Sequence, residues 1–493
     1  MGRRPLAALL VAVAAVVVLA VVAGACGGGG PVVLRNERTG AVEWKRCDTL
    51  ECASISVPLD YARPSGPHIT LALARLPAGG TSKGVLFTNP GGPGASGIGL
   101  LRSAADVFPA EIRNSFDLVS WDPRGVGAST PVSCAADIDA FFAVNRDPHT
   151  AAEVAQNVAA TQSFVDACKR NSSNLLPYMS TAATVRDLDS IRAAIGAQQI
   201  NYVGFSYGTF IGESYAERFP KRVRAMVLDG VVDPARSFAQ ATLDQAKGFE
   251  DDLDAFFRQC GADASCGFAH GGDPAAAYDD LAASIAAEAI PATVDGEHRT
   301  LGRGEFDLGV ASALYAGVDG YERLAGALAQ AGRGTGDTLL AFSDAYTGRQ
   351  AQGKYSNETA VFYATGCLDG PAPPTVAAVQ RLAAQTAKVA PRLGPSSVWL
   401  GLPCTLWPVP AQGKAGPIRA VGAPPIVVVG TTHDPATPYV WAQSLAHELA
   451  SGVLLTSDAA SHTSYGRGDQ CVDGNTDRYL LELRVPAAGT RCG

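Results

Sequence analysis

A serine at the junction of a predicted strand and a predicted helix is the residue in this chain best suited to nucleophilic chemistry. Ser206 stands in the pattern Gly204-x-Ser206-x-Gly208, after the β-prone run 200–203 and before the helix-competent segment 210–218. A strand that turns sharply into a helix strains the serine backbone and needs a small residue on either side. The first amides of the helix then face whatever the serine hydroxyl attacks. The pattern predicts a nucleophile elbow and acyl-transfer chemistry.

A serine nucleophile needs a base, and the base needs a carboxylate that orients it. After an elbow of this kind the acid comes first along the chain and the histidine second. Asp434 directly follows the predicted strand 426–429, and His462 lies in a loop after the last predicted strand, 452–456. We therefore predict a catalytic triad of Ser206, Asp434 and His462.

The remaining histidines fit the role of the base less well. His433 precedes the carboxylate, and His447 lies in a helix-like segment where a surface histidine is expected. The others precede the acid and lie in loops or in the predicted insertion: His68, His149, His270 and His298.

The glycine-rich loop 91–94 follows a buried strand and is predicted to bind the reaction's oxyanion. Acyl transfer builds negative charge on a carbonyl oxygen, and two amides aimed at that oxygen stabilise it by roughly 3 kcal/mol. We expect one amide from Tyr207 and the other from Gly92, because Pro90 and Pro93 have no N–H to donate. A phosphate-binding loop is the alternative, but no Lys-Ser or Lys-Thr pair follows. For a second turn, 122–125, we expect a structural role in which Arg124 pairs with a nearby acid.

Strand-like and helix-like segments alternate up to about residue 235. Two runs, 53–61 and 69–77, indicate an opening antiparallel hairpin. Buried strands are then predicted at 84–88, 116–121, 200–203 and 224–229, with a helix at 181–195. Alternation of this kind predicts βαβ units and a mainly parallel sheet flanked by helices.

The pattern changes beyond Pro234. Helix-like, Ala-rich segments are predicted at 239–260, 275–289, 306–329 and 376–388, and strand character returns only at 424–430 and 452–456. We predict an α/β core formed by residues 44–235 and 421–493. A mainly helical cap, residues 236–420, is inserted before the strand that leads to Asp434. Caps of this kind commonly form the pocket that selects the substrate.

Composition and charge narrow the class of protein. The chain has 493 residues, of which 47% are hydrophobic and only 17% charged, so it buries a large core. Its net charge of −8 argues against a nucleic-acid partner.

The first 26 residues have the composition of an export signal. Arg3 and Arg4 precede an almost purely Ala/Val/Leu run, 5–22, and small residues lead to Cys26. This resembles a bacterial lipobox with Cys26 as the lipidated residue, although Ala23 stands where leucine is usual. Cleavage with release and an uncleaved anchor are the alternatives, since the run is about long enough to cross a bilayer. All three place the folded part outside the cytoplasm, and we expect residues 27–43 to form a flexible linker.

Of the 11 cysteines, ten remain once Cys26 is set aside. They form no CxxC pair and have no histidine at ligand spacing, so we expect no metal site. In an oxidising compartment five disulfides are expected. Connectivity does not follow from sequence alone, but nearest-neighbour pairing closes short loops. That hypothesis gives Cys47–Cys52, Cys134–Cys168, Cys260–Cys266, Cys367–Cys404 and Cys471–Cys492.

With these motifs the chain resembles the secreted actinobacterial tripeptidyl-aminopeptidase family, α/β-hydrolases related to proline iminopeptidases. The resemblance covers nearly the whole mature chain and is especially close to mycobacterial cell-envelope serine hydrolases. Its marks are Val57-Pro-Leu-Asp-Tyr61, Asn89-Pro-Gly-Gly-Pro-Gly94, Asp122-Pro-Arg-Gly125, Gly204-Phe-Ser-Tyr-Gly-Thr209 and His433-Asp-Pro-Ala-Thr-Pro438. It implies the α/β-hydrolase fold and the same roles for Ser206, Asp434 and His462.

We accordingly expect an exported serine (tripeptidyl) aminopeptidase that acts near the N-termini of peptides or exported proteins through an acyl-enzyme, with no cofactor. A cell-envelope carboxylesterase or lipase is the alternative, because fold and triad do not separate amide from ester chemistry. A non-catalytic envelope lipoprotein is the third possibility. An aminopeptidase also needs an anionic group for the substrate ammonium, and Glu305, Asp307 and Asp369 are candidates.

Overall fold

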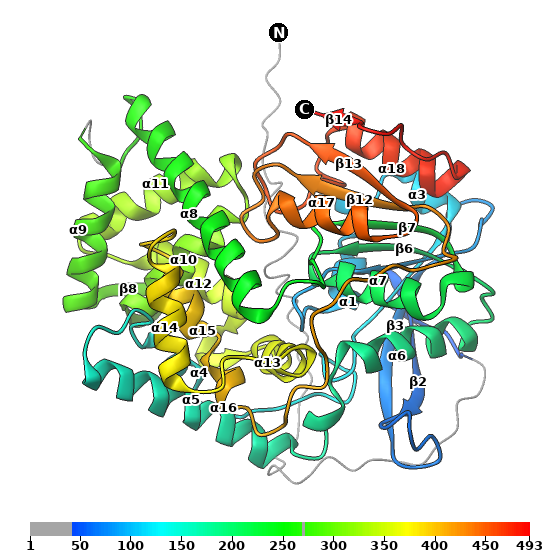
Figure 1. Ribbon diagram of the computed structural model, residues 1–493, viewed down its shortest axis with the longest axis horizontal. Coiled ribbons are helices and arrows are strands. Elements are labelled where there is room, and N and C mark those ends of the chain that lie inside the picture. Colours follow the sequence, from blue (N-terminus) through cyan, green and yellow to red (C-terminus); the bar gives the residue numbers. More distant parts are fainter. Residues whose placement is uncertain (1–41, 269–271) are drawn as a thin grey trace.

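The computed structural model describes residues 42–268 and 272–493 (Figure 1). The predicted export signal, Cys26 and the linker up to residue 41 lie outside the described residues. The described chain is organised around a ten-stranded sheet in the order β1-β2-β3-β5-β4-β6-β7-β12-β13-β14. Its strands are β1 (Lys45–Cys47), β2 (Leu50–Pro58), β3 (His68–Leu76), β4 (Val85–Asn89), β5 (Asp117–Trp121), β6 (Ile200–Phe205), β7 (Val223–Asp229), β12 (Ile426–Thr431), β13 (Gly452–Ser457) and β14 (Arg491–Cys492).

The sheet is antiparallel at its first edge and parallel elsewhere. β2 and β3 form the predicted hairpin, with Pro58 opposite His68, and β3 pairs antiparallel with β5. From β5 through β4, β6, β7, β12 and β13 to β14 each neighbouring pair is parallel. The predicted α/β-hydrolase fold with a mostly parallel sheet is confirmed. Parallel strands end at the same edge, which brings the loops after β4, β6, β7, β12 and β13 together.

Helices cover both faces of the sheet (Figure 1). One face packs against α6 (Thr181–Ala194), α7 (Tyr207–Arg218) and α17 (Tyr439–Glu448), and the other against α1 (Gly97–Arg102), α3 (Ala110–Ser115) and α18 (Gln470–Glu482). Side chains of a strand alternate between faces. Tyr202 of β6 therefore belongs to the first core, whereas its neighbour Val203 belongs to the second. The remaining helices of this part are α2 (Ala104–Val107), α4 (Ile138–Ala143) and α5 (Ala151–Ser172).

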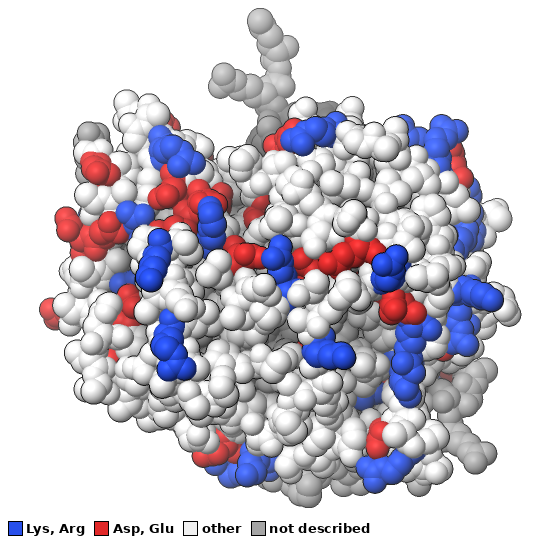
Figure 2. All heavy atoms as spheres, in the orientation of Figure 1, with Lys and Arg blue, Asp and Glu red and all other residues white. Residues whose placement is uncertain are grey.

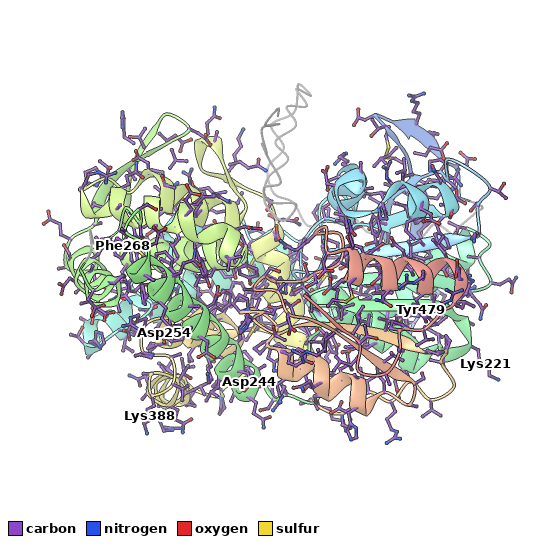
Figure 3. The ribbon with its side chains drawn as sticks, turned by 90° about the horizontal axis from the view of Figure 1, so that it is seen from above. Lys221, Asp244, Asp254, Phe268, Lys388 and Tyr479 are labelled. Carbon is purple, nitrogen blue, oxygen red and sulfur yellow. A yellow bond between two sulfur atoms is a disulfide. The ribbon has the colours of Figure 1, made fainter. Side chains whose placement is uncertain are left out.

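Residues 236–420, between β7 and β12, fold chiefly into helices. These are α8 (Phe238–Ala262), α9 (Pro274–Ala287), α10 (Arg303–Leu314), α11 (Val318–Gly332), α12 (Asp337–Thr347), α13 (Glu358–Asp369), α14 (Val376–Thr386), α15 (Gly394–Leu400) and α16 (Leu402–Leu406). Most of them lie beside the sheet around a separate apolar core that contains Leu253, Phe306 and Leu324. Figure 3 shows the insertion and the sheet side by side. Asp254 and Phe268 are labelled on the insertion, and Lys221 and Tyr479 are labelled on the part that holds the sheet. Asp244 of α8 lies between the two parts.

Two features of the insertion differ from the sequence-based expectation. It contains small antiparallel ladders, β8 (Ile290–Val294) with β9 (Glu297–Leu301) and β10 (Arg349–Gln350) with β11 (Lys354–Tyr355). The predicted helical stretch 306–329 is also broken, because the chain turns between α10 and α11 at Gly317, which has φ 58°. A side chain at Gly317 would overlap the carbonyl of Ala460, so close packing against the loop after β13 causes the break. The insertion also has neighbours outside 236–420, since α5 packs against α16.

The described residues contain five disulfides. They join the same pairs that nearest-neighbour pairing predicts: Cys47–Cys52, Cys134–Cys168, Cys260–Cys266, Cys367–Cys404 and Cys471–Cys492. Within 42–268 and 272–493 there is no helix whose length and apolar character would let it cross a membrane. On the face shown in Figure 2 the acidic side chains gather in a band across the middle, whereas the basic side chains are scattered.

Candidate active site

The turn between β6 and α7 has the backbone conformation that the elbow prediction requires. Ser206 has φ 54° and ψ −128°, values that are strained for a residue with a side chain. A hydrogen bond of 2.9 Å from its N–H to the carbonyl of Asp229 fixes the turn to the end of β7. A methyl group on Gly208 would lie 2.5 Å from the carbonyl oxygen of Asn89, so α7 approaches the loop after β4 as closely as a glycine permits.

Asp434 and His462 meet at the end of β12. Nδ1 of His462 lies 3.0 Å from each carboxylate oxygen of Asp434. Since the carboxylate only accepts, Nδ1 carries the proton and Nε2 is the basic nitrogen. Asp434 also accepts from the amides of Ala436 and Thr437 at 2.9 and 2.8 Å and from the Thr437 hydroxyl at 2.7 Å. Both side chains are buried, and these contacts hold the imidazole in one tautomer.

The structure places this pair beside the elbow without joining it to the serine. Gly230 follows the residue whose carbonyl binds the Ser206 amide, and a methyl group on Gly230 would lie 3.2 Å from Cε1 of His462. Nε2 of His462 is buried and makes no hydrogen bond within the described residues. Hydrogen bonds between nucleophile and base are often long or unformed in unliganded enzymes.

The loop after β4 lies directly against the elbow. A methyl group on Gly91, which has φ 102°, would lie 2.9 Å from Cβ of Ser206 and 3.0 Å from the Tyr207 nitrogen. The Gly91 amide is already used, since it donates to Oδ1 of Asn89 at 3.0 Å. Gly92 is exposed, and its amide makes no hydrogen bond among the described residues. Of the two glycine amides, that of Gly92 is the one free to bind an oxyanion.

Asp229, at the end of β7, is a positioning residue that the sequence analysis did not single out. Its Oδ2 accepts from the amides of Ser464 and Tyr465 at 2.9 and 2.8 Å, so it anchors the loop that carries His462. Burial raises the pKa of Asp229 to about 6, and the two amides counteract that rise. An acid at the end of a buried parallel strand was the available signal in the sequence.

The insertion also contacts the histidine loop. The amide of His462 donates to the carbonyl of Tyr315 at 3.2 Å, and the Tyr315 ring packs edge-on against the imidazole. Trp441 of α17 donates to Asp244 of α8 at 3.0 Å, which adds a second link between the insertion and the sheet.

The three acids named as candidates for binding a substrate ammonium already have partners. Glu305 accepts from the amide of Gly302 at 3.2 Å, and Asp307 pairs with Arg303 at 2.8 Å. Asp369 accepts from the amide and the hydroxyl of Thr181 at 2.8 and 2.6 Å. The Thr181 hydroxyl also contacts the Tyr207 hydroxyl, so Asp369 is linked through Thr181 to the first residue of α7.

Arg124 has the structural role expected of it. Its guanidinium binds both carboxylate oxygens of Asp187 on α6 at 2.7 Å, and both side chains are completely buried. It also donates to the carbonyls of Leu59 and Tyr178, which ties the turn after β5 to the sheet and to α6.

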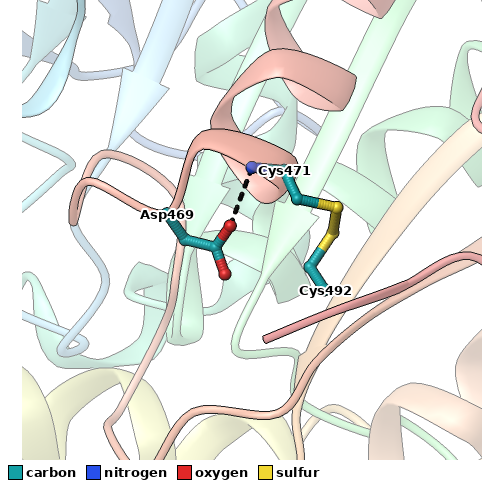
Figure 4. A group of neighbouring side chains, drawn as sticks. All are labelled: Asp469, Cys471 and Cys492. Atoms are coloured by element: carbon teal, nitrogen blue, oxygen red, sulfur yellow. Dashed lines mark hydrogen bonds between the residues drawn. A yellow bond between two sulfur atoms is a disulfide. The ribbon is translucent and has the colours of Figure 1, made fainter.

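Within the described ranges, one group of side chains has the spacing of a metal site: Asp469, Cys471 and Cys492 (Figure 4). The two cysteines form a disulfide, so they offer no thiolate to a metal ion. Asp469 caps α18 by accepting from the amide of Cys471 at 2.8 Å. This group is a disulfide-stabilised helix start.

Comparison with known proteins finds one matching family model and several relatives that are named as hydrolases. The family model described as TAP-like protein matches residues 390–492. Serine protease Hip1 of Mycobacterium tuberculosis is 36% identical over 92% of this chain and 91% of its own length. Carboxylesterase B of the same species is 36% identical over 90% and 86%. The tripeptidyl aminopeptidase of Streptomyces lividans is 33% identical over 92% and 85%.

Proposed function

The chain belongs to the α/β-hydrolase family that includes serine protease Hip1 and the tripeptidyl aminopeptidases, and on that premise we propose that it is a serine peptidase acting near peptide N-termini. The buried Asp434–His462 pair beside the Ser206 turn carries the serine-hydrolase part of the proposal. The similarity to serine protease Hip1 and to the tripeptidyl aminopeptidases supports peptides as the substrate. The unpartnered Nε2 of His462 further supports the serine-hydrolase part. A buried nitrogen without a partner is costly, and a serine hydroxyl or a substrate group is the partner it lacks.

In the proposed mechanism, Nε2 of His462 takes the Ser206 proton as Oγ attacks the scissile carbonyl carbon. Asp434 stabilises the imidazolium that forms. The amides of Tyr207 and Gly92 bind the oxyanion of the tetrahedral intermediate. His462 then protonates the leaving amine, and the acyl group remains on Ser206. In the second half of the reaction His462 takes a proton from water as the water attacks the acyl carbon. The proton then passes to Oγ of Ser206, which leaves.

Enzyme tests can establish the nucleophile and the reaction. We expect wild-type protein to react with a fluorophosphonate probe and to cleave tripeptidyl anilides, and Ser206→Ala to do neither. The matched control is Ser96→Ala, because Ser96 lies at the start of α1 and binds Asp122 instead. An unlabelled but folded wild type would overturn the serine-hydrolase mechanism.

A carboxylesterase is the second candidate, and the 36% identity to carboxylesterase B favours it. Values of kcat/KM for tripeptidyl anilides and for short acyl esters separate the two activities. Amide cleavage requires a general acid that protonates the leaving amine, so the two substrates place different demands on the enzyme. Activity on esters alone would reject the peptidase proposal.

We also propose that the protein is exported and held at the cell envelope through Cys26, with residues 236–420 serving as the cap that selects the substrate. The leader composition and the ten paired cysteines support export. Cys26→Ser should move the protein from the membrane fraction to the soluble extracytoplasmic fraction. Full retention of that variant in the membrane would indicate an uncleaved anchor.

A further inference from the structure

Glu358, the first residue of α13, has a carboxylate without a partner. Burial alone raises its pKa to about 7, and among the described residues no hydrogen bond or ion pair reaches its oxygens. The side chain is nevertheless partly exposed, so protein surrounds it on most sides but leaves it open to solvent. Glu305, Asp307 and Asp369 differ, since each of their carboxylates is bound by neighbouring groups. An acid that is open and unpaired at the rim of a reaction site is suited to bind a cation.

The backbone of Glu358 lies against the loop that faces the elbow. A methyl group on Gly94 would lie 2.6 Å from the Glu358 carbonyl oxygen, and Gly91 of the same loop touches Ser206. Asn357, just before it, donates to the carbonyls of Gly125 and Val132 at 2.7 and 3.0 Å. These contacts fix the start of α13 next to the proposed oxyanion loop.

The carboxylate also lies near the end of α12, in a row of side chains that leads back to the base. Oε2 of Glu358 would be 4.0 Å from a methyl group on Gly348, and its charge acts on the pKa of Tyr346. The hydroxyls of Tyr346 and Tyr315 are 3.5 Å apart, and the Tyr315 ring packs against His462. Glu358 therefore lies between the loop 91–94 and the tyrosines that border the imidazole.

Exposed aromatic side chains flank this carboxylate. Tyr346 is 43% exposed and Phe362 is 45% exposed, although large aromatic residues are usually covered. Phe362 is four residues after Glu358 on α13, so the two lie on the same face of the helix. An acid bordered by exposed rings offers both an ion pair and apolar contact to the end of a peptide.

We propose that Glu358 is the anionic subsite that binds the N-terminal ammonium of the peptide substrate. This inference rests on the proposed peptidase function and deepens it. The ammonium pairs with the free carboxylate, while Tyr346 and Phe362 cover the first side chain of the peptide. The subsite fixes how many residues separate the free amine from the scissile bond, and that fixed separation is what distinguishes an aminopeptidase from an endopeptidase.

The test compares one tripeptidyl anilide with a free amine and the same anilide acetylated at its N-terminus. Wild type should prefer the free amine by about 10- to 100-fold in kcat/KM, the range expected for one charge-assisted hydrogen bond. Glu358→Gln should lose that preference by lowering kcat/KM for the free amine only. The acetylated substrate should change less than about two-fold. Glu358→Asp keeps the charge on a shorter side chain and should retain part of the preference.

Controls separate a lost subsite from a damaged enzyme. Glu322→Gln removes an exposed acid on α11 and should keep the wild-type preference. Fluorophosphonate labelling should proceed at the wild-type rate in Glu358→Gln. An equal fall on both substrates, or an intact preference, would overturn the subsite alone. A wild type that hydrolyses acyl esters but neither anilide would overturn the peptidase function, and the subsite with it.

Discussion

The ring of Tyr315 packs edge-on against the imidazole of His462, with centroids 5.3 Å apart and planes inclined by 83°. Tyr315 belongs to the insertion, whereas His462 follows the last long strand of the sheet. The backbones of the two residues are also joined, since the His462 amide donates to the Tyr315 carbonyl at 3.2 Å. The insertion and the proposed catalytic base are therefore mechanically linked, and a shift of one should alter the other.

Tyr315→Ala should reduce turnover without abolishing it. The change removes an edge-to-face contact worth about 1 kcal/mol and frees the imidazole to rotate away from Ser206. We expect kcat to fall roughly 5- to 10-fold on peptide and ester substrates alike. Tyr315→Phe keeps the ring and should stay near wild type, because the Tyr315 hydroxyl has only a weak 3.5 Å contact with Tyr346. Equal kcat for the Ala variant and wild type would show that the contact does not orient the base.

Asp434→Asn should lower kcat far more than removal of the Thr437 hydroxyl, which donates a hydrogen bond to Asp434. An asparagine amide forces the imidazole toward the wrong tautomer, a change that lowers kcat by about 10⁴-fold in serine proteases with this triad. Thr437→Val deletes one 2.7 Å hydrogen bond to Asp434 and should lower kcat about 3- to 10-fold. Steady-state kinetics on one ester substrate measures both. Similar losses in the two variants would contradict the orienting role of Asp434.

The elements that carry the site could be predicted because their signals are local. The strand before Ser206, the glycines beside it and the helix after it are consecutive in the sequence. β12 and β13 also stand out as apolar runs, and they place Asp434 and His462 in loops at the same edge of the sheet. The αβ alternation and the hairpin of β2 and β3 follow from equally local patterns.

Features that depend on contacts between distant segments could not be predicted. The break at Gly317 exists because the chain there packs against Ala460, more than a hundred residues later. The position of Glu358 beside the site could not be predicted for the same reason. Its neighbours Gly94 and Gly348 come from the loop after β4 and from the end of α12. Asp369 was a candidate for binding the substrate ammonium because its partner Thr181 comes from α6, far from it in the sequence, and the pairing is visible only in the fold.

Asp369→Asn should change how stability depends on pH. Burial raises the pKa of Asp369 to about 7, so the folded protein retains a proton that the unfolded chain releases from about pH 4 upward. The folded state binds more protons in this window, and the contribution of Asp369 to the unfolding free energy falls as pH rises from about 4 to 7. The fall is at most about 1.4 kcal/mol per pH unit.

Asparagine can still accept from the Thr181 amide, but it does not titrate. The unfolding free energy of Asp369→Asn relative to wild type should therefore rise between about pH 4 and 7 and level off above. Urea denaturation at pH 4.5, 6 and 8 measures the difference, with exposed Glu322→Gln as the control. Parallel pH profiles for Asp369→Asn and wild type would show that Asp369 titrates normally.

Removing single disulfides should destabilise the fold by amounts that follow the length of the loop each one closes. The Cys134–Cys168 bridge spans 34 residues, whereas Cys47–Cys52 spans five. Loop-closure entropy predicts a loss of about 4 kcal/mol for the first and about 2 kcal/mol for the second. Double Cys→Ala variants of each pair, compared by their urea midpoints under oxidising conditions, give the two values. A larger loss for the short bridge would show that strain or local packing, and not loop length, sets the contribution of these bridges.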